Sequence, residues 1–308
     1  GENESLLVLD AEGAVMTDAG SIGTAMPRCR GAVRSAAAAA LAFAAVSALA
    51  LGAHGLLPGK GSTMLANVAN LIGEAAAKTP EGLLPLSVME CTTQSGCRQR
   101  DLYVTLDQNW RWYYNPETWK TCAGCSATNC STCVIQADVT YSDYGMTTSD
   151  GNKALEMKKG GRVYVLDETG EEYLMFSLVG KEISWDIDIS ALPCGVNSAI
   201  YLVEMEKNGG SDGGAALGTG YCDAQCPNGD RTVGGKANYD KKHQCCNEFD
   251  LWEANSKSTA YTLHPCLLPN KEPMVGPYQC SGEDCVSKSL NGVCDAYGCD
   301  FNPYRNGK

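Results

Sequence analysis

The clearest chemical potential in the sequence lies in residues 245–255, which read CCNEFDLWEAN. This run contains three carboxylic acids, Glu248, Asp250 and Glu253. Glu248 and Asp250 are two residues apart and share a face if the segment is a β-strand. Glu253 follows at an odd offset, so it reaches that face only if a one-residue bulge near Leu251–Trp252 restores the phase. We therefore predict a bulged strand that carries all three acids on one face.

Three acids on one strand face repel one another, which favours protonation of at least one of them. Glycoside hydrolysis by retention needs such a set, namely one carboxylate nucleophile and one protonated carboxyl group about 5–5.5 Å away. The proton donor needs a raised pKa, which burial or neighbouring charges can provide. The alternative is that the acids decorate the solvent face of an ordinary antiparallel strand. Phe249, Leu251 and Trp252 argue against it, because they leave little polar surface on the other face.

The chain after Cys91 has the pattern of a β-protein. Short runs rich in β-branched and aromatic residues alternate with turn-forming sequences such as Asp150-Gly-Asn, and no long helical period is present. We predict strands at Arg162–Leu166, Tyr173–Leu178, Ile183–Ile189 and Ala199–Met205. Together these features predict an all-β fold, a curved antiparallel β-sandwich.

The charge and the cysteines restrict the class of protein. The net charge of −12 over 308 residues argues against a nucleic-acid partner, which needs a basic surface. Sixteen of the 17 cysteines lie between Cys91 and Cys299, after one apolar stretch, and this density is typical of an oxidising compartment. Cys122, Cys125, Cys130 and Cys133 form a CxxC-x4-CxxC run that resembles a zinc site. The gap between its halves is too short for a zinc ribbon, so we expect local disulfides and no metal or other cofactor.

The N-terminal region divides at an apolar segment. Residues 35–58 are rich in alanine and leucine, and Arg28, Arg30 and Arg34 precede them. The segment is either the core of a cleavable signal peptide that starts at Met26, or a signal-anchor helix with residues 1–34 as a cytoplasmic tail. A buried alanine-rich helix of a soluble domain is a third interpretation. We expect residues 59–88 to be a linker and residues 89–308 to be a partial catalytic domain.

Several motifs in this second part resemble one known family. CCNEFDLWEAN, followed by TLHPC, is similar to the signature of glycoside hydrolase family seven, which comprises cellobiohydrolases and endoglucanases. The resemblance covers roughly residues 89–308 and recurs in LDQNWRW, DIDISALPCGVNSAIYLVEM, GTGYCDAQCP and GCDFNPYR. It implies a jelly-roll β-sandwich of concanavalin-like type with a substrate cleft on its concave face.

The resemblance also implies roles for individual residues. Glu248 matches the nucleophile, Glu253 the general acid/base, Asp250 the acid that holds the nucleophile, and His264 the histidine beside the acid/base. Substrate contacts are implied for Trp110, Trp112, Arg162, Tyr201, Tyr221, Asp223, Gln225 and Arg305. Without the family pattern, a lone histidine, a WxW pair or an exposed arginine would more often be structural.

Loops and cysteines refine the expectation. Only Tyr239–Gln244 stand where cellobiohydrolases carry a long loop over a tunnel, and this favours an open cleft and an endoglucanase. The form of Asp300–Arg305 is closer to the exo-acting enzymes. By resemblance the disulfides are Cys91–Cys97, Cys222–Cys246, Cys226–Cys245, Cys266–Cys294 and Cys280–Cys285. Cys194 and Cys299 are left over, because their family partners lie in a part of the domain that follows Lys308.

The sequence thus predicts a retaining hydrolase of β-1,4-glucosidic bonds in cellulose or a related glucan. The alternatives are a cellobiohydrolase of the same family, a non-catalytic glucan-binding fragment, or a disulfide-rich surface module. We expect a monomer in the secretory pathway that acts outside the cell or at the cell wall, or is anchored facing outside. Contact with a membrane is expected only through the N-terminal segment.

Overall fold

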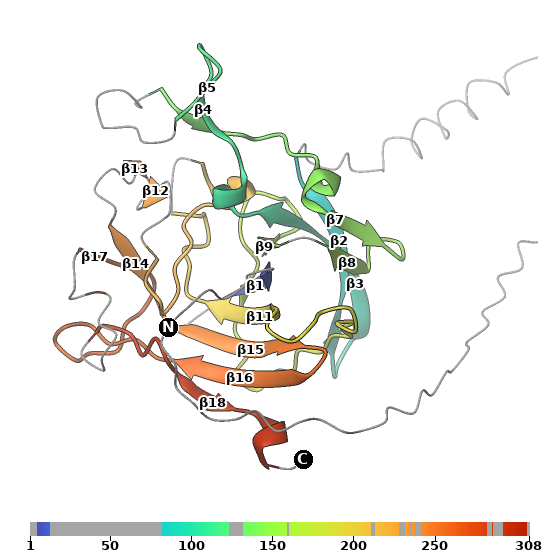
Figure 1. Cartoon of the computed structure of the whole chain (residues 1–308). Coiled ribbons are helices and arrows are strands. Elements are labelled where there is room, and N and C mark those ends of the chain that lie inside the picture. Colours follow the sequence, from blue (N-terminus) through green and yellow to red (C-terminus); the bar gives the residue numbers. More distant parts are fainter. Residues whose placement is uncertain are drawn as a thin grey trace, which may run out of the picture. The chain divides into compact units, whose positions relative to one another are not determined.

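The fold is built almost entirely from β-strands, as Figure 1 shows. The computed structural model describes residues 5–12, 82–122, 132–158, 160–210, 213–227, 232–233, 236–237, 242–281, 285 and 292–306, which all belong to one compact unit. The expected apolar helix at 35–58, Cys29 and most of the expected linker lie outside these residues. Among the described residues, no helix has the length and apolar character needed to cross a membrane.

The strands are short, and the helical elements are single turns of 3-10 helix. The strands are β1 (Ser5–Glu12), β2 (Leu84–Thr92), β3 (Gly96–Leu106), β4 (Tyr113–Asn115), β5 (Lys120–Thr121), β6 (Val134–Ile135), β7 (Met146–Ser149), β8 (Ala154–Met157), β9 (Gly161–Leu166), β10 (Met175–Phe176), β11 (Asn197–Val203), β12 (Thr232–Val233), β13 (Lys236–Ala237), β14 (His243–Cys245), β15 (Glu248–Asn255), β16 (Ser258–His264), β17 (Tyr278–Cys280) and β18 (Cys299–Phe301). The 3-10 turns are η1 (Gln108–Trp110), η2 (Tyr141–Tyr144), η3 (Ala215–Leu217) and η4 (Pro303–Asn306).

One nine-stranded antiparallel sheet dominates the described residues. Its order is β18-β16-β15-β11-β1-β9-β3-β2, with β10 paired to β1 at the side. Buried apolar residues cover both faces of the β3–β9 part, which explains why β9 is buried along its whole length. The antiparallel β-sandwich class predicted from the sequence is confirmed.

Three of the four predicted strand segments contain strands. β9 and β11 fall within or next to the predicted runs, and β10 lies inside Tyr173–Leu178. The prediction for Ile183–Ile189 is wrong, because this segment forms no strand and its side chains are mostly exposed. Its alternating pattern suits a half-buried strand, but a strand also needs a hydrogen-bonded neighbour, and no described strand pairs with it.

Strand β1 lies in the middle of the large sheet. Its residues pair with β11 from Leu6 to Glu12 and with β9 from Val8 to Ala11, all antiparallel. The apolar run at its centre is rich in leucine and valine, which suits a central strand. These residues fall within the segment 1–34 that was expected to be a cytoplasmic tail or the start of a signal peptide, and those boundaries remain a prediction. In the structure, β1 joins the half of the sheet that holds the acids to the half that holds β9.

The disulfides follow the predicted pairing. Bonds join Cys91–Cys97, Cys222–Cys246, Cys226–Cys245, Cys266–Cys294 and Cys280–Cys285. A further bond joins Cys122 to Cys133 within the CxxC-x4-CxxC run, whose inner cysteines lie outside the described residues. Cys194 and Cys299 are free and exposed, as the family pattern implied.

Candidate active site

The acid-bearing strand β15 contains the predicted bulge. Asp250 pairs with Thr262 of β16, whereas Glu253 pairs with Ala260, so the two residues Leu251–Trp252 lie opposite a single residue of β16. The register against β11 shifts at the same place. An extra residue of this kind reverses the alternation of the side chains that follow it. The prediction of a bulged strand is therefore confirmed.

The register against β11 places the three acids on one face. In antiparallel strands, residues directly opposite each other share a face. The acids lie opposite alternate residues of β11, in the pairs Glu248–Val203, Asp250–Tyr201 and Glu253–Ala199. The bulge thus corrects the odd offset of Glu253 that the spacing alone would leave.

Two of the acids are held by hydrogen bonds from neighbouring elements. Glu248 is buried, and its Oε2 accepts a hydrogen bond of 3.0 Å from the backbone N–H of Ala224. Glu253 is half-buried, and its Oε1 accepts a hydrogen bond of 2.9 Å from Asn197 Nδ2. Its other oxygen, Oε2, lies 3.5 Å from Thr262 Oγ1. Each carboxylate is therefore held at one or both oxygens without a cation.

Asp250 is paired instead with a histidine. His264 Nε2 lies 2.9 Å from Asp250 Oδ2, and its Nδ1 lies 2.9 Å from the carbonyl oxygen of Asp295. Both ring nitrogens therefore face acceptors, which only the imidazolium form satisfies with two N–H donors. Burial lowers the pKa of His264, but the hydrogen bonds to Asp250 and Asp295 outweigh it and raise that pKa to about 9. His264 is accordingly a cation at neutral pH.

The environment raises the pKa of both glutamates. Burial raises the pKa of Glu248 well above its ordinary value, and the charges of Asp223 and Asp250 raise it further. The hydrogen bond from the N–H of Ala224 lowers this pKa but does not offset the other effects. Burial also raises the pKa of Glu253, again with a contribution from Asp250. Close carboxyl groups of this kind do not all ionise together, so a proton is retained in the site at mildly acidic pH.

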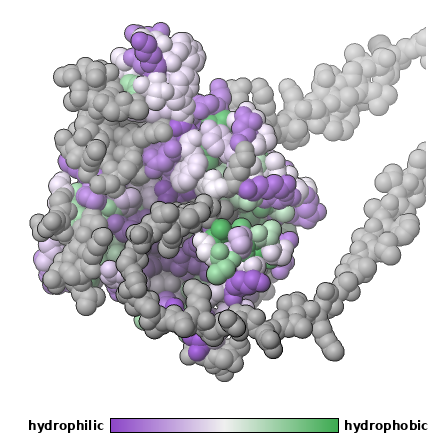
Figure 2. All heavy atoms as spheres, in the orientation of Figure 1, coloured by the Kyte–Doolittle hydropathy of each residue, from purple (hydrophilic) through white to green (hydrophobic). Residues whose placement is uncertain are grey.

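A polar cavity of about 160 Å³ lies over this face. Figure 2 shows hydrophilic residues around a hollow on the face that it presents. The cavity brings together the three acids and five of the predicted substrate-binding residues. Its lining consists of Arg162, Asn197, Ala199, Tyr201, Tyr221, Asp223, Gln225, Glu248, Asp250 and Glu253.

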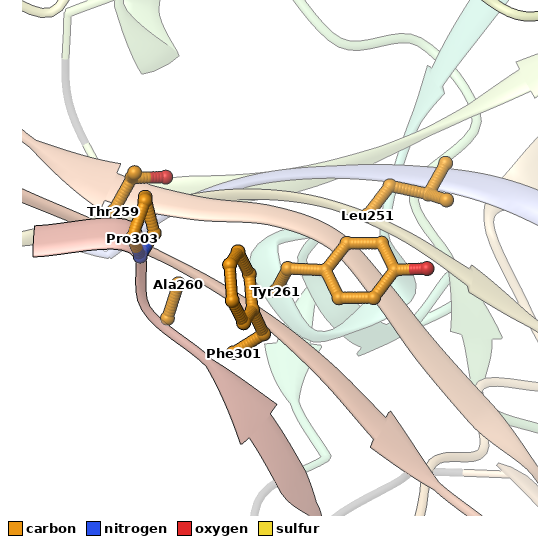
Figure 3. Close-up of a pocket in the computed structure, with 6 residues that line it drawn as sticks. All are labelled: Leu251, Thr259, Ala260, Tyr261, Phe301 and Pro303. Carbon is orange, nitrogen blue, oxygen red and sulfur yellow. The ribbon is translucent and has the colours of Figure 1, made fainter. Parts of the chain in front are cut away.

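A larger cavity, of about 290 Å³, lies elsewhere and has a different character. Figure 3 shows that Leu251, the rings of Tyr261 and Phe301, and Pro303 border it. Leu251 and Tyr261 alternate with the acids and their partners along β15 and β16, so they belong to the opposite side of the sheet. No carboxyl group lines this cavity, and we therefore assign the chemistry to the polar one.

Arg162 is buried in a network at the wall of the polar cavity. Its Nε and one terminal nitrogen each lie 2.9 Å from Asp107 Oδ2, and Tyr164 also donates to that carboxylate. The guanidinium carbon lies 3.2 Å from the ring centroid of Tyr221 and 5.6 Å from that of Trp110. Arg162 therefore links two predicted substrate-binding aromatic residues as well as lining the cavity.

Four predicted residues lie outside the cavity lining. His264 is buried behind Asp250, and Trp110 is connected to the cavity through Arg162. Trp112 is exposed beside β4. Arg305 lies on η4 and forms an exposed ion pair of 2.7 Å with Asp300. Its predicted role as a sugar contact has no support in this geometry and remains a prediction.

The structure adds residues that the sequence analysis did not identify. Asn197 donates to Glu253, the backbone of Ala224 donates to Glu248, and Asp107 holds Arg162. All three residues stand inside motifs quoted above, and this was the only signal in the sequence that pointed to them. Their contacts depend on pairing between segments far apart in the sequence, and no local pattern reveals such pairing.

Two disulfides brace the loop beside Glu248. Cys222–Cys246 and Cys226–Cys245 join residues 222–226 to the start of the acid-bearing segment. Gln244 Nε2 also donates to the carbonyl oxygens of Gly220 and Tyr221. The loop that supplies three predicted cleft residues and the Ala224 N–H is thus fixed against the nucleophile candidate.

The bulged strand, the acids and the polar cavity define a candidate glycoside hydrolase. The sequence profile described as Glycosyl hydrolase family 7 matches residues 75–308. The chain is 38% identical over 258 residues to a probable endo-beta-1,4-glucanase, celB, of Aspergillus terreus, covering 76% of this chain and 59% of that protein. This chain belongs to glycosyl hydrolase family 7.

Solved structures agree with the profile. An endocellulase EGI double mutant of Humicola insolens matches with a TM-score of 0.63 and 36% identity, over 74% of this chain and 60% of that one. A cellobiohydrolase of Daphnia pulex matches with a TM-score of 0.63 and 32% identity over the same shares. The chain spans about 60% of the length of these relatives.

Proposed function

We propose that this protein hydrolyses β-1,4-glucosidic bonds of cellulose or a related glucan with retention of configuration. The observation that carries the proposal is the set of three acids on one strand face, which a bulge aligns beneath a polar cavity. Family membership supports the same reaction class. The similar proteins named endoglucanase, endocellulase and cellobiohydrolase support a glucan substrate.

Glu253 is the proton donor in this scheme. Its raised pKa keeps it protonated at mildly acidic pH, and it can then protonate the glycosidic oxygen of the leaving group. In the second step the resulting carboxylate takes a proton from the water that attacks the intermediate. Asn197, which donates to Oε1, fixes the orientation of this side chain through both steps.

Glu248 is the nucleophile. Its carboxylate attacks the anomeric carbon, forms a glycosyl ester and is released when water attacks. Its raised pKa means that ionisation needs support, which the Ala224 N–H and the positive charge of His264 provide. Asp250 is a positioning residue, since it holds His264 in the charged form beside the two glutamates.

An endo-acting mode fits the chain best. The sequence is short where cellobiohydrolases carry the loop over a tunnel, and an open cleft admits internal bonds of a long chain. The endoglucanase names of the curated relatives support this preference. We further propose that the protein works outside the cytosol, because six described disulfides need an oxidising compartment. A cleaved signal peptide and a signal anchor are both compatible with that proposal.

The test is hydrolysis of a soluble β-1,4-glucan by the full chain, followed as release of reducing ends. Glu248→Gln should abolish turnover, because an amide is a poor nucleophile. Glu204→Gln is the matched control. Glu204 is also a buried glutamate, but its Oε2 accepts from Asn247 and Gly276 and it does not line the cavity, so this variant should stay active.

Glu253→Gln separates the two roles. This variant should lose activity on the glucan yet keep the first step on an aryl glycoside whose leaving group needs no protonation. Turnover by Glu248→Gln equal to the parent would refute the assignment. Binding of the glucan by the parent without any product would favour the non-catalytic glucan-binding alternative.

A further inference from the structure

Three aromatic side chains gather at the hairpin of β4 and β5. Trp112 and Tyr114 have ring centroids 4.3 Å apart at an angle of 17°, and Tyr114 and Trp119 are 5.4 Å apart, also at 17°. Trp112 and Trp119 are 6.3 Å apart at 33°. We name these three residues the hairpin aromatic group. Trp112 and Trp119 each stack on Tyr114, and because the ring planes are close to parallel, the ring faces that this stacking leaves uncovered have similar orientation.

Both tryptophans of the hairpin aromatic group are exposed to solvent, and Tyr114 is half-buried. Trp119 is 66% exposed and Trp112 is 36% exposed. Large apolar rings that gather on a surface lose the stabilisation that burial would provide, and such patches commonly mark a binding site. In Figure 1 the β4–β5 hairpin projects away from β15 and β16.

The turn that holds Trp119 is in an unfavourable backbone conformation. Trp119 has φ of 55°, a left-handed conformation that is unfavourable for a residue with a side chain. Its N–H donates 2.8 Å to the carbonyl oxygen of Asn115. The side chain of Asn115 accepts from the N–H groups of Glu117 and Thr118 and so closes the turn. The local structure thus holds an exposed tryptophan in a strained backbone conformation. Strain of this kind is common at binding sites.

The base of the hairpin is fixed as well. Trp112 Nε1 donates 2.9 Å to Thr121 Oγ1, and the N–H of Cys122 donates 2.9 Å to the carbonyl oxygen of Tyr113. The disulfide Cys122–Cys133 ties the end of the hairpin to the chain before β6. A rigid support of this kind reduces the entropy that the rings would lose on binding a ligand.

The hairpin aromatic group follows Trp110, which contacts the cavity residue Arg162, closely in the sequence. Arg162 lines the cavity and contacts Trp110, and Trp112 follows two residues later. We propose that Tyr114 and Trp119 extend the substrate-binding surface beyond Trp112 and stack on pyranose rings of a long β-1,4-glucan chain. The apolar faces of a sugar ring stack on aromatic rings, and a neutral chain needs no cationic partner in this acidic protein. This inference rests on the proposed function, and neither residue was predicted from the sequence.

The experiment is affinity electrophoresis of the full chain through gels with and without hydroxyethyl cellulose. All proteins carry Glu248→Gln, so that the glucan stays intact. Trp119→Gly is the decisive variant, because glycine removes the ring and relieves the left-handed backbone. We expect an apparent Kd about tenfold higher, a ratio that one lost aromatic contact can produce. The urea concentration at the unfolding midpoint of Trp119→Gly should be equal to or above that of the parent. Such a result would show that the weaker binding is not caused by unfolding.

Three controls make the result specific. Trp119→Phe keeps a flat face and should restore most of the affinity. Trp185→Ala removes a tryptophan of similar exposure to Trp112 that lies outside the group and should not change the Kd. Cellobiose, measured by titration of the intrinsic fluorescence, should bind all of these proteins equally, because none of the varied tryptophans lines the polar cavity.

The outcomes distinguish this inference from the proposed function. If the parent binds hydroxyethyl cellulose and Trp119→Gly binds it equally well, the inference is overturned and the proposed function stands. The inference is also overturned if Trp185→Ala weakens binding as much as Trp119→Gly. A parent that binds neither cellobiose nor the polymer would contradict the proposed function itself.

Discussion

The ion pair between His264 and Asp250 makes the stability of the protein depend on pH in a defined direction. The pKa of His264 is raised from the ordinary 6.5 to about 9 in the folded protein. The folded state therefore binds a proton that the unfolded state has released between these two pH values. This contribution to stability is fully present below pH 6.5 and is lost as the pH rises through about 9.

The size of the effect follows from the shift. A change of about 2.5 in pKa corresponds to about 3 kcal/mol of unfolding free energy, at 1.36 kcal/mol for each unit. That figure is of the order expected for a buried, hydrogen-bonded charge pair. His264→Gln removes the charge and keeps a side-chain N–H donor near Asp250. We expect this variant to be less stable by about 3 kcal/mol at pH 6, and by much less at pH 10.

The assay is urea unfolding of the full chain, followed by tryptophan fluorescence with the disulfides intact. Cys194 and Cys299 are alkylated beforehand, because free thiolates at high pH would exchange with the disulfides. The measured quantity is the difference in unfolding free energy between parent and His264→Gln at each pH. Taking the difference removes the titration of all groups that the two proteins share.

Asp250→Asn is the control for the origin of the shift. The hydrogen bond to Asp250 is the largest contribution that raises the pKa of His264. Removing the carboxylate should reduce the pH dependence, and adding His264→Gln to Asp250→Asn should then cost little at any pH. A difference between parent and His264→Gln that is the same at pH 6 and pH 10 would refute the reasoning.

Two further predictions concern the supports of the site. Gly298→Ala would place a Cβ 2.6 Å from His264 Cε1, whereas Gly276→Ala meets no atom within 4 Å at a similar φ of +70°. Gly276→Ala should therefore lower the free energy of unfolding by about 1–2 kcal/mol, through backbone strain alone. Gly298→Ala should lower it by about 1–3 kcal/mol more and should also reduce activity. Urea unfolding measures the first effect, and turnover of the glucan measures the second. Asp107→Asn should destabilise the protein by about 3–5 kcal/mol in the same assay, since it leaves the buried charge of Arg162 without its carboxylate. Equal costs for the two alanine variants, or a neutral Asp107→Asn, would contradict these assignments.

The acid-bearing strand was predictable because its information is local. The spacing of Glu248, Asp250 and Glu253 required one extra residue, and both neighbouring strands shift register at that place. The free state of Cys194 and Cys299 was predictable for a different reason, because the family motifs indicate which cysteines have partners within this chain.

Features that depend on pairing between distant segments were not predictable. Asn197 reaches Glu253 only because β11 and β15 are neighbours in the sheet, although 56 residues separate them in the sequence. Ser5–Glu12 carries a pattern suited to many environments, and its place between β9 and β11 is set by the sheet. Conversely, Ile183–Ile189 has the alternation of a strand but pairs with no described strand.

The cations of the site are committed to particular acids. Arg162 is paired with Asp107, and His264 with Asp250. Each pair is buried, and breaking either one would take a hydrogen-bonded carboxylate away from a buried cation. The charges of Arg162 and His264 also lower the pKa of Asp223 and of Glu248, but burial outweighs them and raises both pKa values.

At least one of the remaining acids must then hold a proton. Asp223, Glu248 and Glu253 line the same cavity, and no described residue forms an ion pair with any of them. Burial raises the pKa of all three, and each ionised member disfavours ionisation of the next. Glu248 has the N–H of Ala224 to support its charge, whereas Glu253 is held by a side-chain amide and a hydroxyl. Retaining hydrolysis begins with Glu248 ionised and Glu253 protonated, whereas burial raises the pKa of Glu248 well above its ordinary value, so the Ala224 N–H and the nearby His264 cation must hold the negative charge on Glu248.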